Sequence, residues 1–490
     1  TAGWPLTLLL TPEGKPFFAG TYFPKRTMRG LTGLIDLLTE AKDTWKDRKK
    51  DIIKESNYIL KEVDSRYNSY SKGNIDKDIL IIAKKELENI YDKANGGFSY
   101  RPKFPLPQYI LFLLEYGYNL KDEKSLNMAK KTLDNMYKGG IFDHVGFGFY
   151  RYSVDEKWLV PHFEKMLYDN ALLAIAYIRA YEITGELLYK DIGEKIFEFV
   201  LRDMTSDIGG FYSALDAETE GEEGKYYVFE YDEIINLLGE EFGRFYASYY
   251  DISEEGNFEG KNIPNLIGKN LNSITEFDMN KLNSMRVRIL SYRDKRIKPH
   301  RDEKILTSWN GLMIAALAYG GKVLNKNLFI KKAKESADFI ISNSIDKKGY
   351  LLSTHIDGKS YNYGYLEDYA FFIYGLLTLY KVTEEEVYLE ISKKLKDDMV
   401  KLFWDEKDGG FYYYSHISES LILRPKDFYD GAIPSGNSFA ALSLQKLYRI
   451  IEDEEIYERL NQIFYSFGDS TNKNPTAYIY SILASRIFDL

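Results

Sequence analysis

The segment 143–170 concentrates side chains that could transfer a proton. It holds two of the five histidines of the chain, His144 and His162, among carboxylates and aromatic residues. A histidine beside carboxylates can act as a general acid or base near neutral pH, and a hydrogen-bonded structural histidine is the alternative. The candidate ligand contacts of this segment are His144, Arg151, Trp158, Glu164, Asp169 and Asn170.

The last part of this segment is predicted to be helical. Pro161 suits the first turn of a helix, and a helix would place His162, Lys165 and Asp169 on one face. We expect this helix near 163–184, with His162 at its start beside the acidic and aromatic side chains.

Polar residues also precede a second apolar helix, which we expect near 308–323. Thr307 or Ser308 can cap this helix, and the positive end of its dipole would favour anionic or hydroxyl-rich ligands. The candidate ligand contacts here are His300, Arg301, Asp302, Trp309 and Asn310. The alternative is a helix cap with surface salt bridges.

Three further carboxylates, Asp216, Asp368 and Asp430, lie in loops or at helix starts, where they could line a shared pocket. Asp216 opens an acidic loop, 216–224, which is either a solvated tip or a set of groups for sugar hydroxyls or a divalent cation. Its spacing does not match an EF-hand, and we predict no metal site. Asp368 and Asp430 begin further apolar helices, the second with Asn437, and each could be a helix cap. Glycoside hydrolysis needs two carboxylates across a sugar, and which two would pair stays open.

A Gly-Gly pair followed by an aromatic or apolar residue returns four times between the helical stretches. One such pair is ordinary turn chemistry, whereas four near helical hairpins indicate a repeated structural unit. The repeats are Gly96-Gly97-Phe98, Gly139-Gly140-Ile141, Gly209-Gly210-Phe211 and Gly409-Gly410-Phe411.

Helical periodicity dominates residues 75–490. Some expected helices are apolar nearly all round and others carry Lys and Glu on one face, which indicates a buried layer inside a half-exposed one. Six hairpins in two layers make an (α/α)6 toroid with a central cavity, so we predict a mainly α fold of this class. The expected helices lie near 76–92, 107–119, 123–137, 163–184, 187–204, 278–297, 308–323, 327–344, 365–381, 385–402, 436–450, 453–466 and 475–488, with short ones near 231–250.

Two β-hairpin inserts are expected to shape the mouth of that cavity. In the first, 211–214 would pair with 225–229, and in the second, 411–414 would pair with 421–423. Both pairs combine β-branched or aromatic residues with an intervening turn-rich stretch.

Residues 1–70 have a different pattern. Two β-rich runs, 6–11 and 17–22, flank a turn and predict a β-hairpin, and helical spacing follows from about 31 to 67. Two strands and a helix cannot bury a core alone. We therefore expect the C-terminal half of a small α/β domain, joined to the toroid by a linker at 71–74.

Composition argues against several classes of partner. The net charge is −9 without a visible basic patch, so we expect no nucleic-acid partner. No apolar run reaches about 18 residues, so we expect no membrane span and a cytoplasmic protein. The chain has no cysteine, which excludes disulfides and thiolate chemistry within it. It starts with Thr1 rather than Met, and we expect an incomplete N-terminus.

Several long motifs together resemble the spermatogenesis-associated protein 20 family, thioredoxin-like proteins also called domain of unknown function 255. The similarity spans nearly the whole chain. The matching stretches are Gly3-Trp4-Pro5-Leu6-Thr7, Gly20-Thr21-Tyr22-Phe23-Pro24, Arg101-Pro102-Lys103-Phe104-Pro105, 158–170, 216–224 and 298–311.

The resemblance implies a thioredoxin-like domain followed by an (α/α)6 domain similar to six-hairpin glycosidases and N-acylglucosamine 2-epimerases. Residues 1–70 would be the second half of the first domain, with Pro5 as its cis-proline. The family often carries a cysteine motif upstream of this point. Redox activity is therefore not carried over to these residues.

The similar folds imply two sets of catalytic candidates. In epimerases of similar fold, cavity histidines move a proton at a sugar carbon, which makes His162 and His300 candidates. In hydrolases of similar fold, carboxylates act, which makes Asp216, Asp368 and Asp430 candidates.

Three hypotheses follow. The first is a carbohydrate-active enzyme, an epimerase, isomerase or hydrolase, that binds a sugar in the toroid without a cofactor. The second is a thioredoxin-fold redox or chaperone-like protein whose toroid only binds a partner or glycan. The third is a structural ring with a degenerate pocket, because one fold hosts many functions.

Overall fold

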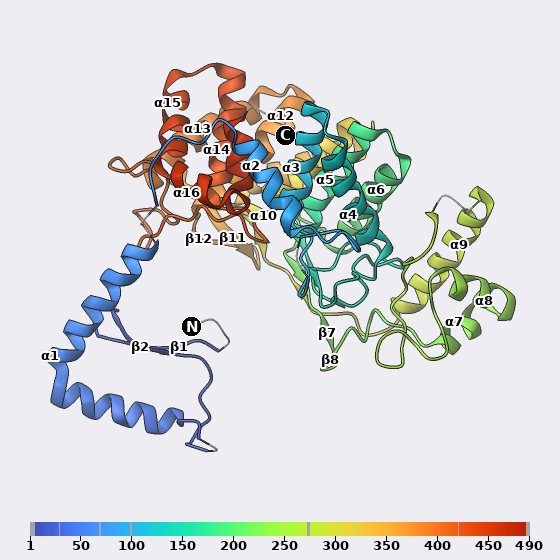
Figure 1. The fold of residues 1–490 in the computed structure, drawn as a ribbon, viewed down its shortest axis with the longest axis horizontal. Helices are drawn as coiled ribbons and strands as arrows, with labels where there is room; N and C mark the ends of the chain where they lie inside the picture. The colour runs from blue at the N-terminus through green and yellow to red at the C-terminus, as the bar shows by residue number, and fades with distance from the viewer. Residues whose placement is uncertain are drawn as a thin grey trace.

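The computed structural model describes residues 5–28, 30–67, 70–98, 100–271, 275–419 and 421–486, and Figure 1 shows their arrangement. Most of this part of the chain is helical, with a small N-terminal part beside a large helical body. None of the described helices combines the length and the apolar character that crossing a bilayer requires.

The N-terminal part consists of a β-hairpin and one long helix. Strand β1 (Thr7–Leu10) pairs antiparallel with β2 (Pro16–Gly20). Helix α1 (Leu34–Tyr67) bends at Arg48, whose φ and ψ are not helical. The predicted hairpin and helix are confirmed, while the Trp4–Pro5 bond lies outside the described residues.

The predicted linker after α1 is bound along the surface of the helical body. The Tyr70 hydroxyl donates to the Lys426 carbonyl at 2.6 Å, and its ring lies 4.8 Å from that of Phe428. The Gly73 amide donates to the Tyr465 carbonyl at 2.9 Å. These contacts fix the point at which α1 leaves the body.

Within the described residues, six helices form a closed inner ring. Each contacts the next in the order α3, α5, α10, α12, α14 and α17, and α17 closes the ring against α3. Their bounds are α3 (Pro107–Leu120), α5 (Leu167–Thr184), α10 (Thr307–Val323), α12 (Leu366–Thr383), α14 (Gly436–Ile451) and α17 (Ile479–Ser485).

An outer helix packs against each inner one, which confirms the expected (α/α)6 toroid. Helices α4, α6, α11, α13 and α15 follow α3, α5, α10, α12 and α14 in the chain, and α2 covers α17. Their bounds are α2 (Ile79–Ile90), α4 (Glu123–Lys138), α6 (Leu187–Asp203), α11 (Asn327–Asn343), α13 (Glu386–Phe403) and α15 (Glu454–Ser466).

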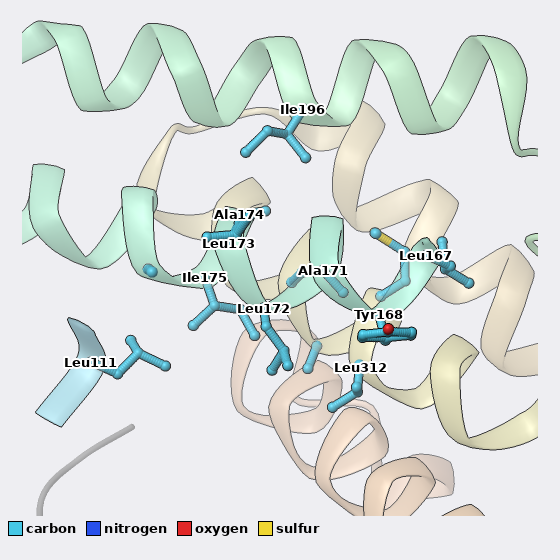
Figure 2. Packing of buried hydrophobic residues seen from close by; sticks show 14 of the residues in the cluster. Leu111, Leu167, Tyr168, Ala171, Leu172, Leu173, Ala174, Ile175, Ile196 and Leu312 are labelled. Atoms are coloured by element: carbon cyan, nitrogen blue, oxygen red, sulfur yellow. The ribbon is translucent and has the colours of Figure 1, made fainter. Parts of the chain in front are cut away.

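The apolar core explains why the inner helices are hydrophobic on every side. Figure 2 shows α5 between Leu111 of α3, Ile196 of α6 and Leu312 of α10, with its own Leu172 and Ala174 buried among them. Burying one such leucine side chain contributes roughly 1.5–3 kcal/mol. A helix enclosed in this way needs no polar face.

One expected helix lies outside the two layers. Helix α9 (Glu276–Arg293), predicted near 278–297, packs on α7 (Tyr231–Leu238) and α8 (Glu240–Tyr249) in an insertion between α6 and α10. The helix predicted over 475–488 is divided instead. The chain forms α16 (Gly468–Lys473), the 3-10 helix η2 (Pro475–Tyr478) and α17, and residues 487–490 lie outside the described part.

The Gly-Gly repeats form equivalent turns before the strands that lead back to the ring. In each, the amide of a polar residue donates to a carbonyl four or five positions on. The pairs are Asp92 with Gly97, Asp143 with Gly148, Ser206 with Gly210, Asp346 with Tyr350, and Asp405 with Gly410. Gly139-Gly140 does not form such a turn. The equivalent turn in this repeat is formed by residues 143–148, where the Asp143 amide donates to the Gly148 carbonyl.

Three inner helices hold the residue after such a turn with an asparagine. Asn170, Asn310 and Asn437 each accept the amide of one phenylalanine at 2.7–2.8 Å and donate back to its carbonyl at 2.8–3.0 Å. Asn170 binds Phe149, Asn310 binds Phe211, and Asn437 binds Phe411 in this way. Each side-chain amide also donates to a second backbone carbonyl. Full burial and these backbone hydrogen bonds favour a structural role for the three asparagines over their predicted role as ligand contacts.

Short strands link the loops at the end where the inner helices begin. They form the sheets β3–β4, β5–β6–β9, β7–β8 and β10–β11–β12, besides β1–β2. Their bounds are β3 (Tyr152–Ser153), β4 (Pro161–His162), β5 (Lys165–Met166), β6 (Ala214–Leu215), β7 (Glu218–Thr219), β8 (Glu222–Glu223), β9 (Arg301–Asp302), β10 (Ile305–Leu306), β11 (Leu352–Ile356) and β12 (Lys359–Tyr363).

Both predicted hairpin pairings are wrong. Phe211 bridges to Thr205 and Phe229 to Asn262, and the acidic loop forms its own hairpin, β7–β8. Phe411 bridges to Trp404. Among the described residues, 421–423 form no strand, although Tyr413 donates its amide to the Pro425 carbonyl.

Candidate functional site

The loops that carry the predicted site residues gather at one end of the ring. Long connections lead into the inner helices, such as 139–166 before α5 and 344–365 before α12. The return connections are short, such as 185–186 after α5 and 324–326 after α10. Side chains from several loops can therefore meet only where the inner helices begin.

His162 lies at this end among polar and aromatic side chains. Its ring stacks on that of Tyr152 with centroids 4.9 Å apart. Glu164 Oε2 lies 3.6 Å from Nδ1, and Glu223 Oε1 lies 4.0 Å from Nε2. Arg151 forms an ion pair of 3.0 Å with Glu164. We call these five residues the His162 cluster.

The first turns of two inner helices lie beside the cluster. Tyr168 and Asp169 come from α5, and Trp309, half-buried, comes from α10 with its ring 4.8 Å from that of Tyr168. Burial raises the pKa of Asp169 well above its ordinary value, and Arg151 opposes this shift only in part. Burial therefore favours the protonated form of the Asp169 carboxyl group, which can donate a hydrogen bond.

Three buried polar atoms in this region have no hydrogen-bond partner among the described residues. They are Arg151 Nε, His162 Nδ1 and Asp169 Oδ2. Buried polar atoms are almost always paired, so each exception calls for an explanation. Water molecules, or a ligand with several hydroxyl groups, would supply the missing hydrogen-bond partners.

The predicted helical face at His162 is wrong. Helix α5 begins at Leu167, and the chain before it is extended, with Tyr152 opposite His162 in register. Extended residues alternate sides. His162 and Glu164 share the face of the cluster, while Phe163 stacks on Tyr227 at 5.8 Å on the other side.

Lys165, on that other side, belongs to a structural ion pair. Its ammonium lies 2.7 Å from Asp143, which also pairs with Arg293 at 3.0 Å. Burial lowers the pKa of Lys165 to about 8, against the opposing effect of Asp143. Equivalent turns contain Lys103–Asp92 at 2.7 Å and Lys426–Asp405 at 2.5 Å. Because equivalent Lys–Asp pairs occur in three turns of the ring, we assign Lys165 and Asp143 a structural role in holding their turn.

His300, Arg301 and Asp302 line a separate hollow of about 600 Å³. The register places Lys165, Leu215 and Arg301 side by side, and all three line this hollow. His300 is exposed and accepts the Asp216 amide through its carbonyl at 2.9 Å. Arg301 pairs with Glu303 at 2.7 Å, and Asp302 with Lys304 at 3.0 Å. No contact joins these residues to the His162 cluster within the described chain.

Two predicted ligand contacts are core residues. His144 is buried among Tyr137, Phe142 and Tyr250, with Nε2 3.2 Å from the Gly139 carbonyl. Burial lowers its pKa to about 4.

Trp158 is fully buried rather than offering a stacking surface. It packs between Gly97 and Gly139, where a Cβ would lie within 2.6 Å of its side chain. Its indole nitrogen donates to the Asn95 carbonyl at 3.1 Å.

The predicted catalytic aspartates do not form a facing pair. Asp368 accepts the amides of Ser308 and Tyr365 at 2.9 Å, and Asp430 accepts those of Ser435 at 3.0 Å and Tyr480 at 2.8 Å. Burial raises their pKa values to about 6 and about 7. Asp216 is exposed. The two buried aspartates therefore tie the starts of neighbouring inner helices together.

The prediction missed two aromatic residues near His162, Tyr152 and Tyr168. Glu223 lies in the acidic loop 216–224, which was predicted as a possible set of groups for sugar hydroxyls. In the first turn of α12, burial and Asp368 raise the pKa of Glu367 to about 8. A position in the first turn of an inner helix was the available signal for Tyr168 and Glu367. No group of three or more His, Asp or Glu side chains in the described chain is arranged to hold a metal ion.

The ring of paired helices places this protein among the (α/α)6 toroids. The structure of cellobiose 2-epimerase from Bacillus thermoamylovorans B4167 matches 81% of this chain and 88% of its own with a TM-score of 0.53 and 13% identity. A D-mannose isomerase matches 80% and 85% with a TM-score of 0.53 and 13% identity. A family 76 glycoside hydrolase from a bovine Bacteroides thetaiotaomicron strain matches 83% and 77% with a TM-score of 0.50 and 9% identity. These likenesses show the fold alone.

Sequence relatives give the family. Spermatogenesis-associated protein 20 of Homo sapiens is 34% identical over 97% of this chain and 67% of its own length, and that of Mus musculus is 34% identical over 97% and 66%. Residues 1–64 match a thioredoxin-like family model described as "Protein of unknown function, DUF255". The chain belongs to the spermatogenesis-associated protein 20 family, and it spans about two thirds of the length of these relatives.

Proposed function

We propose that this protein binds a carbohydrate at the His162 cluster and moves a proton next to its carbonyl carbon, as a sugar epimerase or isomerase does. The three unpartnered buried atoms, Arg151 Nε, His162 Nδ1 and Asp169 Oδ2, carry this proposal. Support comes from the fold, because structures of this fold include a cellobiose 2-epimerase and a D-mannose isomerase.

The geometry supports a division of roles. His162 takes the proton from the carbon beside the carbonyl, and Glu164 and Glu223, at 3.6 and 4.0 Å, stabilise the imidazolium that forms. Asp169, in the protonated form that burial favours, donates a hydrogen bond to the developing oxyanion. Delivery of a proton to the opposite face of the same carbon inverts that carbon, and delivery to the former carbonyl carbon isomerises the sugar.

The other hypotheses have less support. Hydrolysis has less support because the carboxyl groups of Asp368 and Asp430, two of its candidates, accept hydrogen bonds from backbone amides. A dithiol reaction would need cysteines from outside these 490 residues, which contain none.

The test is solvent deuterium exchange. The protein is incubated in D2O with mannose, glucose, fructose or cellobiose, and proton NMR follows the signal of the hydrogen on the carbon beside the carbonyl. We expect loss of that signal and appearance of the epimer or isomer. His162→Asn should slow the exchange by about 100-fold or more, the usual range for a lost acid–base group.

The matched control is His416→Asn, since His416 is exposed and contacts the Leu402 carbonyl away from the cluster. Its exchange rate should equal that of the unchanged protein. Absence of exchange with all four sugars would contradict the proposed reaction, and an undiminished rate in His162→Asn would contradict the proposed site.

A further inference from the structure

The hollow beside His300 extends from the protein surface to a buried floor. Its volume is about 600 Å³, and small-molecule sites commonly measure roughly 300–1,000 Å³. His300 is exposed at the rim, whereas Lys165, Tyr227 and Arg293 are buried at the inner end. Because Lys165 points to the side of the extended chain opposite His162, this hollow is distinct from the His162 cluster. We call it the His300 hollow.

Three parts of the fold meet around this hollow. The sheet β5–β6–β9 forms one wall, on which Leu215 lies beside Arg301. Helix α6 ends there with Arg202, and α9, which belongs to the insertion between α6 and α10, ends there with Arg293. Positive charge in the last turn of a helix offsets the helix dipole. The presence of these two arginines is therefore explained without a ligand.

Two buried polar atoms at the floor lack a hydrogen-bond partner within the described chain. They are Arg293 Nε and the Tyr227 hydroxyl oxygen. Arg293 is 2% exposed and Tyr227 4%, and the guanidinium carbon lies 5.4 Å from the centre of the Tyr227 ring. The Nε–H group can only donate, and the hydroxyl group can also donate. Since buried polar atoms are almost always paired, the floor lacks a group that accepts two hydrogen bonds.

The floor also holds two positive charges for one negative charge. Asp143 is paired with Lys165 at 2.7 Å and with Arg293 at 3.0 Å, and all three side chains are buried. In the equivalent turn, Asp92 pairs with one cation of the described residues, Lys103, at 2.7 Å. Burial and the repulsion of Arg293 lower the pKa of Lys165 to about 8. An anion with a single charge would balance this excess of two minus one, +1.

The charged groups of the outer wall are mostly paired with one another. Arg202 pairs with Asp203 at 2.6 Å, and Arg301 with Glu303 at 2.7 Å. Such pairs add no net charge but offer both N–H donors and carboxylate acceptors, which match ligand hydroxyl groups because a hydroxyl both donates and accepts. Asp357 adds a further carboxylate at the exposed rim, which disfavours a ligand with two negative charges.

We propose that the His300 hollow binds a small carboxylic acid with several hydroxyl groups, such as a sugar acid, whose carboxylate accepts hydrogen bonds from Arg293 Nε and the Tyr227 hydroxyl. One carboxylate supplies two acceptor oxygens for the two donors and one negative charge for the buried excess. The hydroxyl groups of the ligand face the charge pairs of the outer wall. This site is separate from the proton transfer at His162.

Calorimetric titration with four probes tests the class of ligand. Glucuronate and gluconate are polyhydroxy monocarboxylates. Glucuronamide has the size and hydroxyl groups of glucuronate without the charge, and inorganic phosphate has charge without the hydroxyl-bearing body. We expect saturable binding of glucuronate or gluconate, and at least about tenfold weaker binding of glucuronamide and phosphate.

Variants locate the binding. Tyr227→Phe removes a hydroxyl group without a partner in the described chain, so it should keep the fold and weaken the tighter acid about tenfold. Tyr246→Phe is the matched control, because the Tyr246 hydroxyl is also buried and unpartnered among the described residues, but this tyrosine lies on α8 and does not line the hollow. Arg293→Lys keeps a positive charge for Asp143 and removes Nε, which gives a second test.

His162→Asn separates this proposal from the proposed sugar reaction, since it should leave the affinity for the acid unchanged. Weaker binding in Tyr227→Phe, with unchanged binding in Tyr246→Phe and His162→Asn, supports the proposal. Absence of saturable binding of both acids overturns it, as does tighter binding of phosphate or glucuronamide. It is also overturned by equal affinities in Tyr227→Phe, Arg293→Lys and the unchanged protein, or by a loss of binding only in His162→Asn.

Discussion

His162 differs from the other histidines in its charged surroundings. Among the described residues it is the histidine with carboxylate oxygens within 4.0 Å, and there are two of them, on Glu164 and Glu223. His144 and His355 are buried in apolar surroundings instead. A proton-transferring imidazole needs groups that stabilise its charged form without holding it permanently, and the distances of 3.6 and 4.0 Å fit that need.

Glu367 provides a test of the electrostatics at the helix starts. Burial and the neighbouring Asp368 and Asp427 raise its pKa to about 8. The folded protein therefore binds a proton there that the unfolded chain releases at its ordinary pKa, near 4.3. The free energy of unfolding falls as pH rises from about 4.5 to about 8, because over this window the folded state binds more protons.

Replacing Glu367 by Gln removes this titration. At about pH 9 the variant should unfold at a Tm several degrees above that of the unchanged protein, and at about pH 4.5 the two values should agree. Differential scanning calorimetry at both pH values measures this, with Glu406→Gln, an exposed position on the turn after α13, as control. An equal Tm at high pH would show that Glu367 is ionised without cost.

At the scale of elements, the asparagine clamps join three inner helices, α5, α10 and α14, to the turns that hold Phe149, Phe211 and Phe411. Asn437 satisfies both backbone groups of Phe411 and the carbonyl of Asp427. Phe411 is fully buried, and an unsatisfied buried backbone group costs about 1–3 kcal/mol. The clamps therefore hold the loops at the end of the ring that carries the candidate site.

Asn437→Ala should lower the stability of the ring by about 2–4 kcal/mol, the sum expected for such losses. Asn437→Asp keeps the acceptor for the Phe411 amide but turns a second oxygen toward the carbonyls of Phe411 and Asp427 and buries a carboxylate, so a loss at least as large is expected. Thermal unfolding followed by circular dichroism ranks the two variants. Asn280→Ala, exposed on α9, is the control, and an equal Tm for all three variants would refute the clamp.

The element patterns explain which predictions succeeded. Helices such as α5 and α10 are apolar on all sides, and helices such as α11 carry charge on one side, so the two layers were visible in periodicity alone. The hairpin pairings were wrong for two reasons. Ala214 pairs with the remote Met166 and Asp302, and local spacing does not contain that information. Phe211 and Phe411 bridge instead to Thr205 and Trp404, which precede them across the glycine turns.

The candidate site was predictable only in part for a related reason. His162, Lys165 and Asp169 have helical spacing, but the chain is extended until Leu167, since strand pairing with Tyr152 competes with the helix. His144 and Trp158 have the composition of site residues and lie in the core. Burial depends on how the turns pack together, which residue types alone do not specify.

At the scale of the whole molecule, the ring separates two chemical environments. The end where the inner helices begin carries long loops, short strands and the His162 cluster. The other end carries short connections and a hollow lined by Glu115 and Arg179. The N-terminal hairpin and α1 join the body through Tyr70 and Gly73, on the surface near Lys426 and Tyr465.

The most direct test of the account is to locate a bound sugar. Crystals of the His162→Asn variant, in which turnover should be about 100-fold slower, are soaked with mannose or cellobiose. The account predicts a sugar ring at the starts of α5 and α10, with hydroxyl groups within hydrogen-bonding distance of Arg151 and Asp169. A sugar found only in the hollow lined by Arg179, or only beside His300, would contradict it.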